Sequence, residues 1–310
     1  MDKISQLLLK FGFDPRQEFS LERSVLGTLH LPNCEGFGLS IQRDDLIHPV
    51  ISGNKWRKLE GWVRYAKNGG YHTLVTFGGA YSNHLVATAA AGSMLGFNTI
   101  GLLRADEPIT NHYLEIASGY GMDIRGISRE LYREKSQLTS EFSSLEGHLV
   151  IPEGGQGDLA FEGFEQLVLN LAGKVDVILH ASATATTAVG LALAIKKHNL
   201  GLKVKAILVL KNVQSQIEYA AFHGVSEIIE FVDGYHFGGY AKTTEELMNF
   251  TSEFEMLNQI VIDPVYTSKA LWAMREMCLK GAFLGHRVAF LHTGGMLGRF
   301  SDKFAPKLEN

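Results

Sequence analysis

The chain has 310 residues, of which 45% are hydrophobic and 20% charged, and its formal net charge is −4. This composition is ordinary for a globular enzyme of one large or two smaller domains, and the negative charge argues against nucleic acid or an anionic membrane as a partner. Because Cys34 and Cys278 are the only cysteines, we expect neither a disulfide framework nor a thiolate metal site. The N-terminus lacks the apolar core of a signal peptide and no apolar run reaches membrane-spanning length, so the sequence predicts a soluble cytoplasmic protein.

Strand and helix patterns alternate along most of the chain. A short amphipathic helix and an irregular segment precede an alternating strand at residues 38–43. Further strands are predicted at residues 73–77, 98–103, 123–127, 148–152, 176–181, 205–210, 259–263 and 288–292. Helices are predicted between most of them, at residues 56–67, 84–95, 111–119, 129–141, 158–172, 186–198, 215–223, 243–255 and 268–280. This alternation predicts an α/β fold with parallel sheets covered by helices on both faces.

Residues 53–60, Gly-Asn-Lys-Trp-Arg-Lys-Leu-Glu, read as a tight turn that leads into a helix. Gly53 can adopt backbone angles closed to other residues, and Asn54 is a favourable helix cap. Lys55 and Lys58 are three residues apart, so they share one side of the first helical turn, where the macrodipole disfavours positive charge. A Schiff base on one lysine and a phosphate beside the other would relieve this repulsion. A solvated basic turn explains the same spacing, and these residues alone favour it.

Residues 78–84, Gly-Gly-Ala-Tyr-Ser-Asn-His, connect the predicted strand at 73–77 to an alanine-rich helix. Ser82 or Asn83 would cap that helix, which leaves free N–H groups and positive dipole at its start. Such a start suits a small anion, for example a substrate carboxylate, and the two glycines let a ligand approach the backbone closely. A capped strand–turn–helix without any ligand explains the pattern equally well.

Two further segments have ligand-binding patterns. The hydroxyl-rich loop at 182–187, Ser-Ala-Thr-Ala-Thr-Thr, suits a phosphate at a helix start, although such loops also cap helices without a ligand. Residues 155–160 fit the dinucleotide pattern G-x-G-x-x-A, with Asp176 at a suitable distance, but they do not open the fold and Asp176 starts its strand. The alternative hypothesis of a nicotinamide-dependent dehydrogenase depends on these glycines alone. None of the twelve histidines forms a ligand-like pair, so no metal site is expected.

Six ordered segments resemble the family of pyridoxal-phosphate enzymes that contains 1-aminocyclopropane-1-carboxylate deaminase and D-cysteine desulfhydrase. The resemblance extends from about residue 38 to residue 300. Its most specific segment is G-N-K-x-R-K-L-E at 53–60. The other segments are G-G-x-x-S-N-H at 78–84, I-P-E-G-G at 151–155, T-A-T-T at 184–187, D-P-V-Y-T-x-K-A at 263–270 and H-T-G-G at 292–295.

The resemblance implies the type II fold of pyridoxal-phosphate enzymes, similar to tryptophan synthase β: two three-layer domains with mostly parallel sheets. Residues 1–59 plus 155–310 would form the larger, cofactor-binding domain, and residues 60–154 a smaller inserted α/β domain. The cofactor, pyridoxal 5'-phosphate, would lie between the two domains. The family also suggests a homodimer.

By position in these motifs, the resemblance assigns a role to each candidate site residue. Lys55 would bind the cofactor as a Schiff base. Further cofactor contacts would come from Lys58, Asn83, Thr184, Ala185, Thr186, Thr187, Thr267 and Thr293. The candidate acid–base groups are Ser82, Tyr266 and, in a loosely aligned segment, Tyr240. Ser82, Asn83 and His84 would bind the substrate, a small amino acid.

The identity of residue 267 bears on the substrate. In the deaminases a glutamate follows the tyrosine of P-V-Y and contacts the pyridine nitrogen, whereas Thr267 follows Tyr266 here. A neutral hydroxyl does not favour a protonated ring. Threonine at this position resembles the desulfhydrase branch of the family, so the resemblance implies a D-cysteine desulfhydrase that forms pyruvate, ammonia and sulfide. The alternatives are a deaminase that opens 1-aminocyclopropane-1-carboxylate to 2-oxobutyrate and ammonia, and a family member without turnover. Ala185 replaces a family glycine, and the arginine usual near Val86 is absent.

Overall fold

The computed structural model describes residues 3–10, 14, 17–51, 53–211 and 213–300. Packing divides the chain into two compact units. The first unit comprises Met1–Phe19 and His48–Ala160, and the second comprises Ser20–Ile47 and Phe161–Asn310. Lys55 therefore packs in the same unit as residues 60–154. The functional division into a cofactor-binding domain of 1–59 plus 155–310 and an inserted domain stays a prediction.

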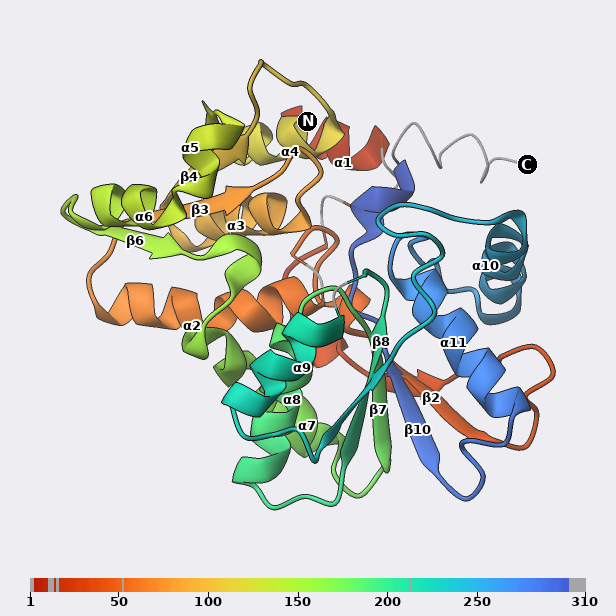
Figure 1. Cartoon of the computed structure of the whole chain (residues 1–310). Helices are drawn as coiled ribbons and strands as arrows, with labels where there is room; N and C mark the ends of the chain where they lie inside the picture. Colours follow the sequence, from red (N-terminus) through yellow and green to blue (C-terminus); the bar gives the residue numbers. More distant parts are fainter. Residues whose placement is uncertain (1–2, 11–13, 15–16, 52, 212, 301–310) are drawn as a thin grey trace. The chain divides into compact units, whose positions relative to one another are not determined.

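The first unit is built on a four-stranded parallel sheet with the strand order β5-β4-β3-β6 (Figure 1). Its strands are β3 (Thr73–Gly78), β4 (Asn98–Arg104), β5 (Asp123–Ile127) and β6 (His148–Ile151). Its helices are α1 (Lys3–Lys10), α2 (Asn54–Asn68), α3 (Asn83–Leu95), α4 (His112–Gly119), α5 (Arg129–Arg133), α6 (Lys135–Ser143) and the 3-10 turn η3 (Glu153–Gly155). Helices cover both faces, because Val75 and Phe77 of β3 pack with α5 and α6 while Thr76, pointing the other way, bonds to α3.

The second unit is built on a six-stranded sheet with the order β1-β2-β10-β7-β8-β9, in which only β1 and β2 pair antiparallel. Its strands are β1 (Leu26–Thr28), β2 (Gly38–Gln42), β7 (Val177–Ser182), β8 (Lys203–Leu208), β9 (Ile229–Val232) and β10 (Arg287–Leu291). Its helices are α7 (Glu165–Leu171), α8 (Thr186–Lys197), α9 (Val213–Phe222), α10 (Glu245–Asn258) and α11 (Thr267–Leu279), with 3-10 turns η1 (Leu21–Arg23), η2 (Asp44–Leu46) and η5 (Met296–Phe300). Alternate strand residues bury against opposite layers: Leu179 packs with α10 and α11, and Ile178 packs with α7, α8 and α9.

The predicted class, α/β with mostly parallel sheets, is confirmed, but the strand predicted at 259–263 is wrong. Gln259 ends α10 in the left-handed conformation, with a φ of 53°. The N–H of the buried Ile262 then donates to the Glu255 carboxylate at 2.9 Å, so this backbone group is satisfied by a side chain instead of a neighbouring strand. The sequence pattern missed two strands, β1 and β9, which pair with β2 and β8 at the two edges of the six-stranded sheet.

Two predicted helices are interrupted. The helix predicted at 129–141 is two helices, α5 and α6, which are separated at Glu134 with a ψ of 45°. The helix predicted at 158–172 begins as a 3-10 helix, η4 (Asp158–Phe164), and becomes α-helical only in α7. None of the helices in the described ranges is both long and apolar enough to cross a membrane.

Candidate functional site

The start of α2 presents two lysines at an uncapped helix N-terminus. Gly53 has a φ of 60°, which favours glycine, and it occupies the N-cap position. The sequence predicts Asn54 as the cap, but Asn54 is the first residue of the helix and no side chain caps it. The first turn also has no acidic residue. Lys55 and Lys58 therefore lie where the helix dipole disfavours cations and nothing within α2 offsets it.

Both amines have lowered pKa values. Burial lowers the pKa of Lys55 to about 8. Burial, followed by the charge of Lys55, lowers the pKa of Lys58 well below its usual range. Lys58 is only 3% exposed, whereas Lys55 keeps part of its surface accessible. With a pKa one unit above neutrality, roughly a tenth of the Lys55 amine is unprotonated at pH 7, far more than for an ordinary lysine.

His84 is a buried, neutral imidazole in the same unit. The Thr76 hydroxyl donates to the carbonyl of Ile151 at 2.8 Å, so it accepts its second hydrogen bond from Nε2 of His84 at 2.9 Å. This arrangement leaves Nδ1 as an acceptor, and it is buried with no partner among the described residues. Burial, and then the charges of Lys55 and Lys58, lower the pKa of His84 well below its usual range. The imidazole can therefore accept a hydrogen bond from a ligand.

Gly155 lies against both Lys58 and His84. A Cβ on this residue would be 3.3 Å from Cβ of Lys58 and 3.2 Å from Cε1 of His84, and its φ of 73° favours glycine. The indole of Trp62 donates to the Gly155 carbonyl at 3.3 Å and holds the turn. The dinucleotide pattern at 155–160 therefore does not open an α-helix: it runs into η4, and its first glycine gives space beside the lysine and the histidine.

Ser82 is the N-cap of α3, as the sequence predicts. Its Oγ accepts the N–H of Leu85 at 3.3 Å, and Gly78 is required nearby because a Cβ there would approach that Oγ to 2.7 Å. Ser82 and the following Asn83 are partly exposed, whereas His84 is buried. The exposed N-terminus of α3 thus offers N–H groups and a hydroxyl proton to a small anion.

In the second unit, the hydroxyl loop 184–187 leads from β7 into α8. The N-cap is Ala185, and no side chain caps the helix. Oγ1 of Thr186 is buried and has no hydrogen-bond partner in the described part of the chain. An uncapped helix start with an orphaned buried hydroxyl has the donors that a phosphate requires. The φ of Ala185 is −68°, an ordinary value, so the family glycine is not needed for the backbone conformation.

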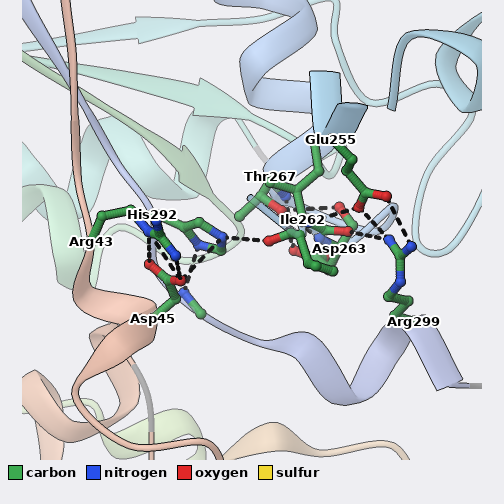
Figure 2. A network of polar contacts seen from close by, with 10 residues as sticks. Arg43, Asp45, Glu255, Ile262, Asp263, Thr267, His292 and Arg299 are labelled. Carbon is green, nitrogen blue, oxygen red and sulfur yellow. Dashed lines mark hydrogen bonds and ion pairs between the residues drawn. The ribbon is translucent and has the colours of Figure 1, made fainter. Parts of the chain in front are cut away.

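Thr267 lies in a polar network at the start of α11 (Figure 2). The Asp263 carboxylate accepts the N–H groups of Val265, Tyr266 and Thr267 at 2.8, 2.7 and 3.0 Å. It also accepts the Thr267 hydroxyl at 2.7 Å, and that hydroxyl in turn accepts the N–H of Asp263 at 2.8 Å. Burial raises the pKa of Asp263, and these hydrogen bonds oppose the rise. The neutral side chain expected to face the cofactor ring is thus bonded directly to a buried carboxylate.

The network continues on both sides of this turn (Figure 2). Arg299 donates to the Glu255 carboxylate at 2.9 Å and to the Ile262 carbonyl at 3.3 Å, which holds the segment that replaces the predicted strand. Nε2 of His292 lies 2.9 Å from the Val261 carbonyl, and its Nδ1 accepts a backbone N–H. These two contacts of the His292 ring hold the backbone that follows β10 in place.

Thr293, a predicted cofactor contact, follows β10 and is buried. Because β7 and β10 are neighbouring parallel strands, Thr293 and the loop 184–187 both leave the carboxyl edge of one sheet, where ligands of such sheets bind.

Tyr240 and Tyr266, the two candidate acid–base tyrosines, are brought together. Their ring centroids are 6.2 Å apart. Tyr240 is 51% exposed, whereas Tyr266 is partly buried. Burial, followed by Tyr240 and Asp263, raises the pKa of Tyr266, so its hydroxyl stays protonated over the physiological range. Tyr266 therefore keeps a hydroxyl that can donate a hydrogen bond, and Tyr240 is open to solvent.

Lys269 is a residue that the sequence analysis missed. It is fully buried, and its Nζ donates to the carbonyls of His236 and Gly239 at 2.9 and 2.8 Å. Because Gly239 directly precedes Tyr240, these bonds hold the segment that carries this tyrosine. The available signal was the lysine of D-P-V-Y-T-x-K-A, a motif that the sequence analysis quoted without assigning this residue a role. No group of three or more metal-ligating side chains occurs in the described residues.

Comparison with known proteins gives four consistent matches. Residues 28–294 match the family model described as pyridoxal-phosphate dependent enzyme. The Pyrococcus horikoshii protein named "Putative 1-aminocyclopropane-1-carboxylate deaminase" is 32% identical over 320 residues, which covers 96% of each chain. The bifunctional D-cysteine desulfhydrase/1-aminocyclopropane-1-carboxylate deaminase of Arabidopsis thaliana is 29% identical, with 90% of this chain and 78% of that protein covered. A crystal structure of an ACC deaminase homologue has a TM-score of 0.77 at 31% identity and covers 99% of this chain and 100% of its own.

Proposed function

The chain belongs to the family of pyridoxal-phosphate-dependent enzymes, and from this premise we propose that it is a lyase that eliminates sulfide from D-cysteine. Its fold is the type II fold of these enzymes, and its cofactor is pyridoxal 5'-phosphate. The observation that carries the proposal is Lys55. It lies at the uncapped start of α2, and its pKa is lowered to about 8, as a covalent cofactor ligand and proton carrier requires.

The residues fit the cofactor chemically. Lys55 would hold it covalently, and a nucleophilic lysine must be neutral to do so. The phosphate would satisfy the buried hydroxyl of Thr186, at a helix start that no side chain caps. Lys58 would add positive charge when a phosphate offsets its burial. Asn83, Thr267 and Thr293 are proposed to contact the ring.

Bound pyridoxal phosphate supplies an electron sink that stabilises negative charge at the substrate α-carbon. The chain's own groups do the rest. Once the substrate amine has taken its place on the cofactor, Lys55 would be free as a neutral amine and would accept the α-proton at Nζ. Ser82, Asn83 and the N–H groups of α3 bind the substrate carboxylate, and the orphaned Nδ1 of His84 accepts a hydrogen bond from the substrate. Tyr266 holds its proton at Oη, because its pKa is raised. It is the proposed acid for the leaving group.

The choice of D-cysteine rests on Thr267, because a hydroxyl beside the pyridine nitrogen does not enforce protonation as a glutamate does. A second candidate is 1-aminocyclopropane-1-carboxylate deamination. This second candidate is favoured by the Asp263 carboxylate, which accepts the Thr267 hydroxyl at 2.7 Å. Through Thr267, the carboxylate would offer the pyridine nitrogen a negative charge, as the glutamate of the deaminases does directly. Relatives of both names match this chain.

The cofactor assignment is tested by an absorption spectrum of the purified protein before and after borohydride, followed by peptide mapping. We expect a visible band that reduction fixes onto Lys55. Lys55→Ala should lose the band and the activity, Lys58→Ala should mainly weaken retention of the cofactor, and Lys67→Ala, an exposed lysine on the same helix, should change neither. Normal turnover by Lys55→Ala would refute the assignment.

The substrate assignment is tested by initial rates on both candidates. We expect release of pyruvate and sulfide from D-cysteine to be faster than release of 2-oxobutyrate from 1-aminocyclopropane-1-carboxylate. The reverse order would transfer the proposal to the deaminase. If a protein that carries the cofactor on Lys55 catalysed neither reaction, the result would favour the hypothesis of a non-catalytic member of the family.

A further inference from the structure

A basic depression lies on the first unit, at the C-terminal end of β4 and along α5. Its volume is about 600 Å³ and it is lined by five residues: Arg104, Arg129, Tyr132, Arg133 and Lys135. Four of the five carry a positive charge, and no carboxylate lines the depression. A volume of this size is typical of sites for small organic molecules.

Two of the four cations already have carboxylate partners. Arg129 is paired with Asp106 at 3.2 Å, and Lys135 is paired with Glu153. Arg104 and Arg133 make no ion pair with any described residue, and the guanidinium of Arg104 lies 5.6 Å from the centroid of the Tyr132 ring. Two guanidinium charges in one depression are therefore left without a counter-charge.

The Tyr132 hydroxyl is an independent sign of a ligand. Tyr132 is only 3% exposed, and its hydroxyl has no hydrogen-bond partner of acceptable geometry among the described residues. Burial, followed by the charge of the Glu153 carboxylate and a close contact with it, raises the pKa of Tyr132, so the hydroxyl remains a donor. Glu153 is already paired with Lys135, and its contact with the phenol lacks the geometry of a hydrogen bond. Buried polar groups without a partner are rare in native proteins and require an explanation such as a bound water or ligand.

We propose that this depression binds the phosphate monoester group of a small organic molecule, separately from the phosphate of the cofactor. A phosphate monoester carries close to two negative charges at neutral pH and has three acceptor oxygens. It therefore matches two unpaired guanidinium groups and one phenolic donor, whereas a single carboxylate would leave one charge unmatched. Arg104 also lies close to the loop before α3, because a Cβ on Gly79 would be 3.6 Å from its Nη2.

The test is calorimetric titration of the cofactor-loaded enzyme in about 0.15 M salt, at which surface charges are screened. The probes are inorganic phosphate, adenosine monophosphate and adenosine without phosphate. We expect one-to-one binding of both phosphates and no binding of adenosine. Arg104→Ala and Arg133→Ala should each weaken binding by about tenfold or more. Arg129→Ala, which removes a lining arginine that is already paired, should weaken it by less than about threefold.

Two further variants keep the proposal falsifiable. Tyr132→Phe removes only the orphaned hydroxyl, so we expect weaker phosphate binding with no loss of melting temperature. Phosphate binding that is unchanged in the Arg104→Ala, Arg133→Ala double variant would overturn the site. An equal loss in Arg129→Ala would show that general surface charge, and thus an adventitious ion only, explains the binding. Binding lost in Thr186→Val but kept in Arg133→Ala would place the phosphate at the cofactor loop and also overturn the proposal.

Discussion

The imidazole of His84 donates its Nε2 proton to the hydroxyl of Thr76 across 2.9 Å, because the Thr76 proton is already committed to the carbonyl of Ile151. One buried threonine on β3 thus determines which nitrogen of His84 is protonated. The unprotonated Nδ1 is left as an acceptor beside Gly155, which is also in contact with Lys58. The tautomer of the histidine follows from a residue eight positions earlier in the chain.

Thr76→Val should destabilise the protein. It removes the acceptor of the His84 N–H and the donor to the Ile151 carbonyl, and a buried polar group without its partner costs about 1–3 kcal/mol. The free energy of unfolding in urea measures the loss. Thr88→Val is the matched control, since the Thr88 hydroxyl bonds a helical carbonyl of His84 that has another partner, and it should cost less than about 1 kcal/mol. Equal losses would contradict the assigned network.

The stability of the cofactor-free protein should depend on Lys55 and pH. The folded pKa is about 8 and the ordinary value is 10.5, so between these values the unfolded chain binds more protons than the folded protein. The free energy of unfolding should therefore rise with pH from about 8 to 10.5, by up to about 3 kcal/mol. Lys55→Met removes this contribution. The difference between wild type and variant, measured at the two ends of this range, should change; a constant difference would refute the lowered pKa.

Tyr266→Phe should lower kcat by about 10²–10⁴-fold, the range expected when a general acid is removed. The protein should still bind the cofactor, because the tyrosine is proposed to act only on the substrate. Tyr240→Phe should have a smaller effect, since Tyr240 is half exposed and water can replace its hydroxyl. The measurements are kcat and the absorbance of the bound cofactor for both variants. A larger loss of kcat for Tyr240→Phe than for Tyr266→Phe would show that Tyr240, and not Tyr266, is the acid.

Lys269→Met should lower kcat through Tyr240. The substitution leaves the carbonyls of His236 and Gly239 without their buried donor, so the segment before Tyr240 loses its position. A double-mutant cycle with Tyr240→Phe measures the coupling, and the second substitution should add little to the first. Lys280→Met, at the exposed end of α11, should leave kcat unchanged. Additive effects would show that Lys269 serves stability alone.

Most of the fold was predictable because its signals are local. Alternating strand and helix patterns identified both parallel sheets, and the glycine turn before Lys55 and the cap at Ser82 were read from adjacent residues. The strand predicted at 259–263 was wrong. Ile260 and Ile262 are buried, but the backbone of Ile262 bonds to the side chains of Glu255 and Arg299 and not to a neighbouring strand. Periodicity reports burial and cannot report the partner of a backbone group.

The sequence by itself determined the α/β class, the identity of the lysine at the start of α2 and the hydroxyl loop at 184–187. Only the tertiary structure decided the pKa of Lys55, the tautomer of His84 and the clamp that Lys269 forms. These properties depend on desolvation and on hydrogen bonds between segments far apart in the chain, such as Thr76 and Ile151. A residue's type sets which protons it can hold, and the surrounding packing sets whether it holds them.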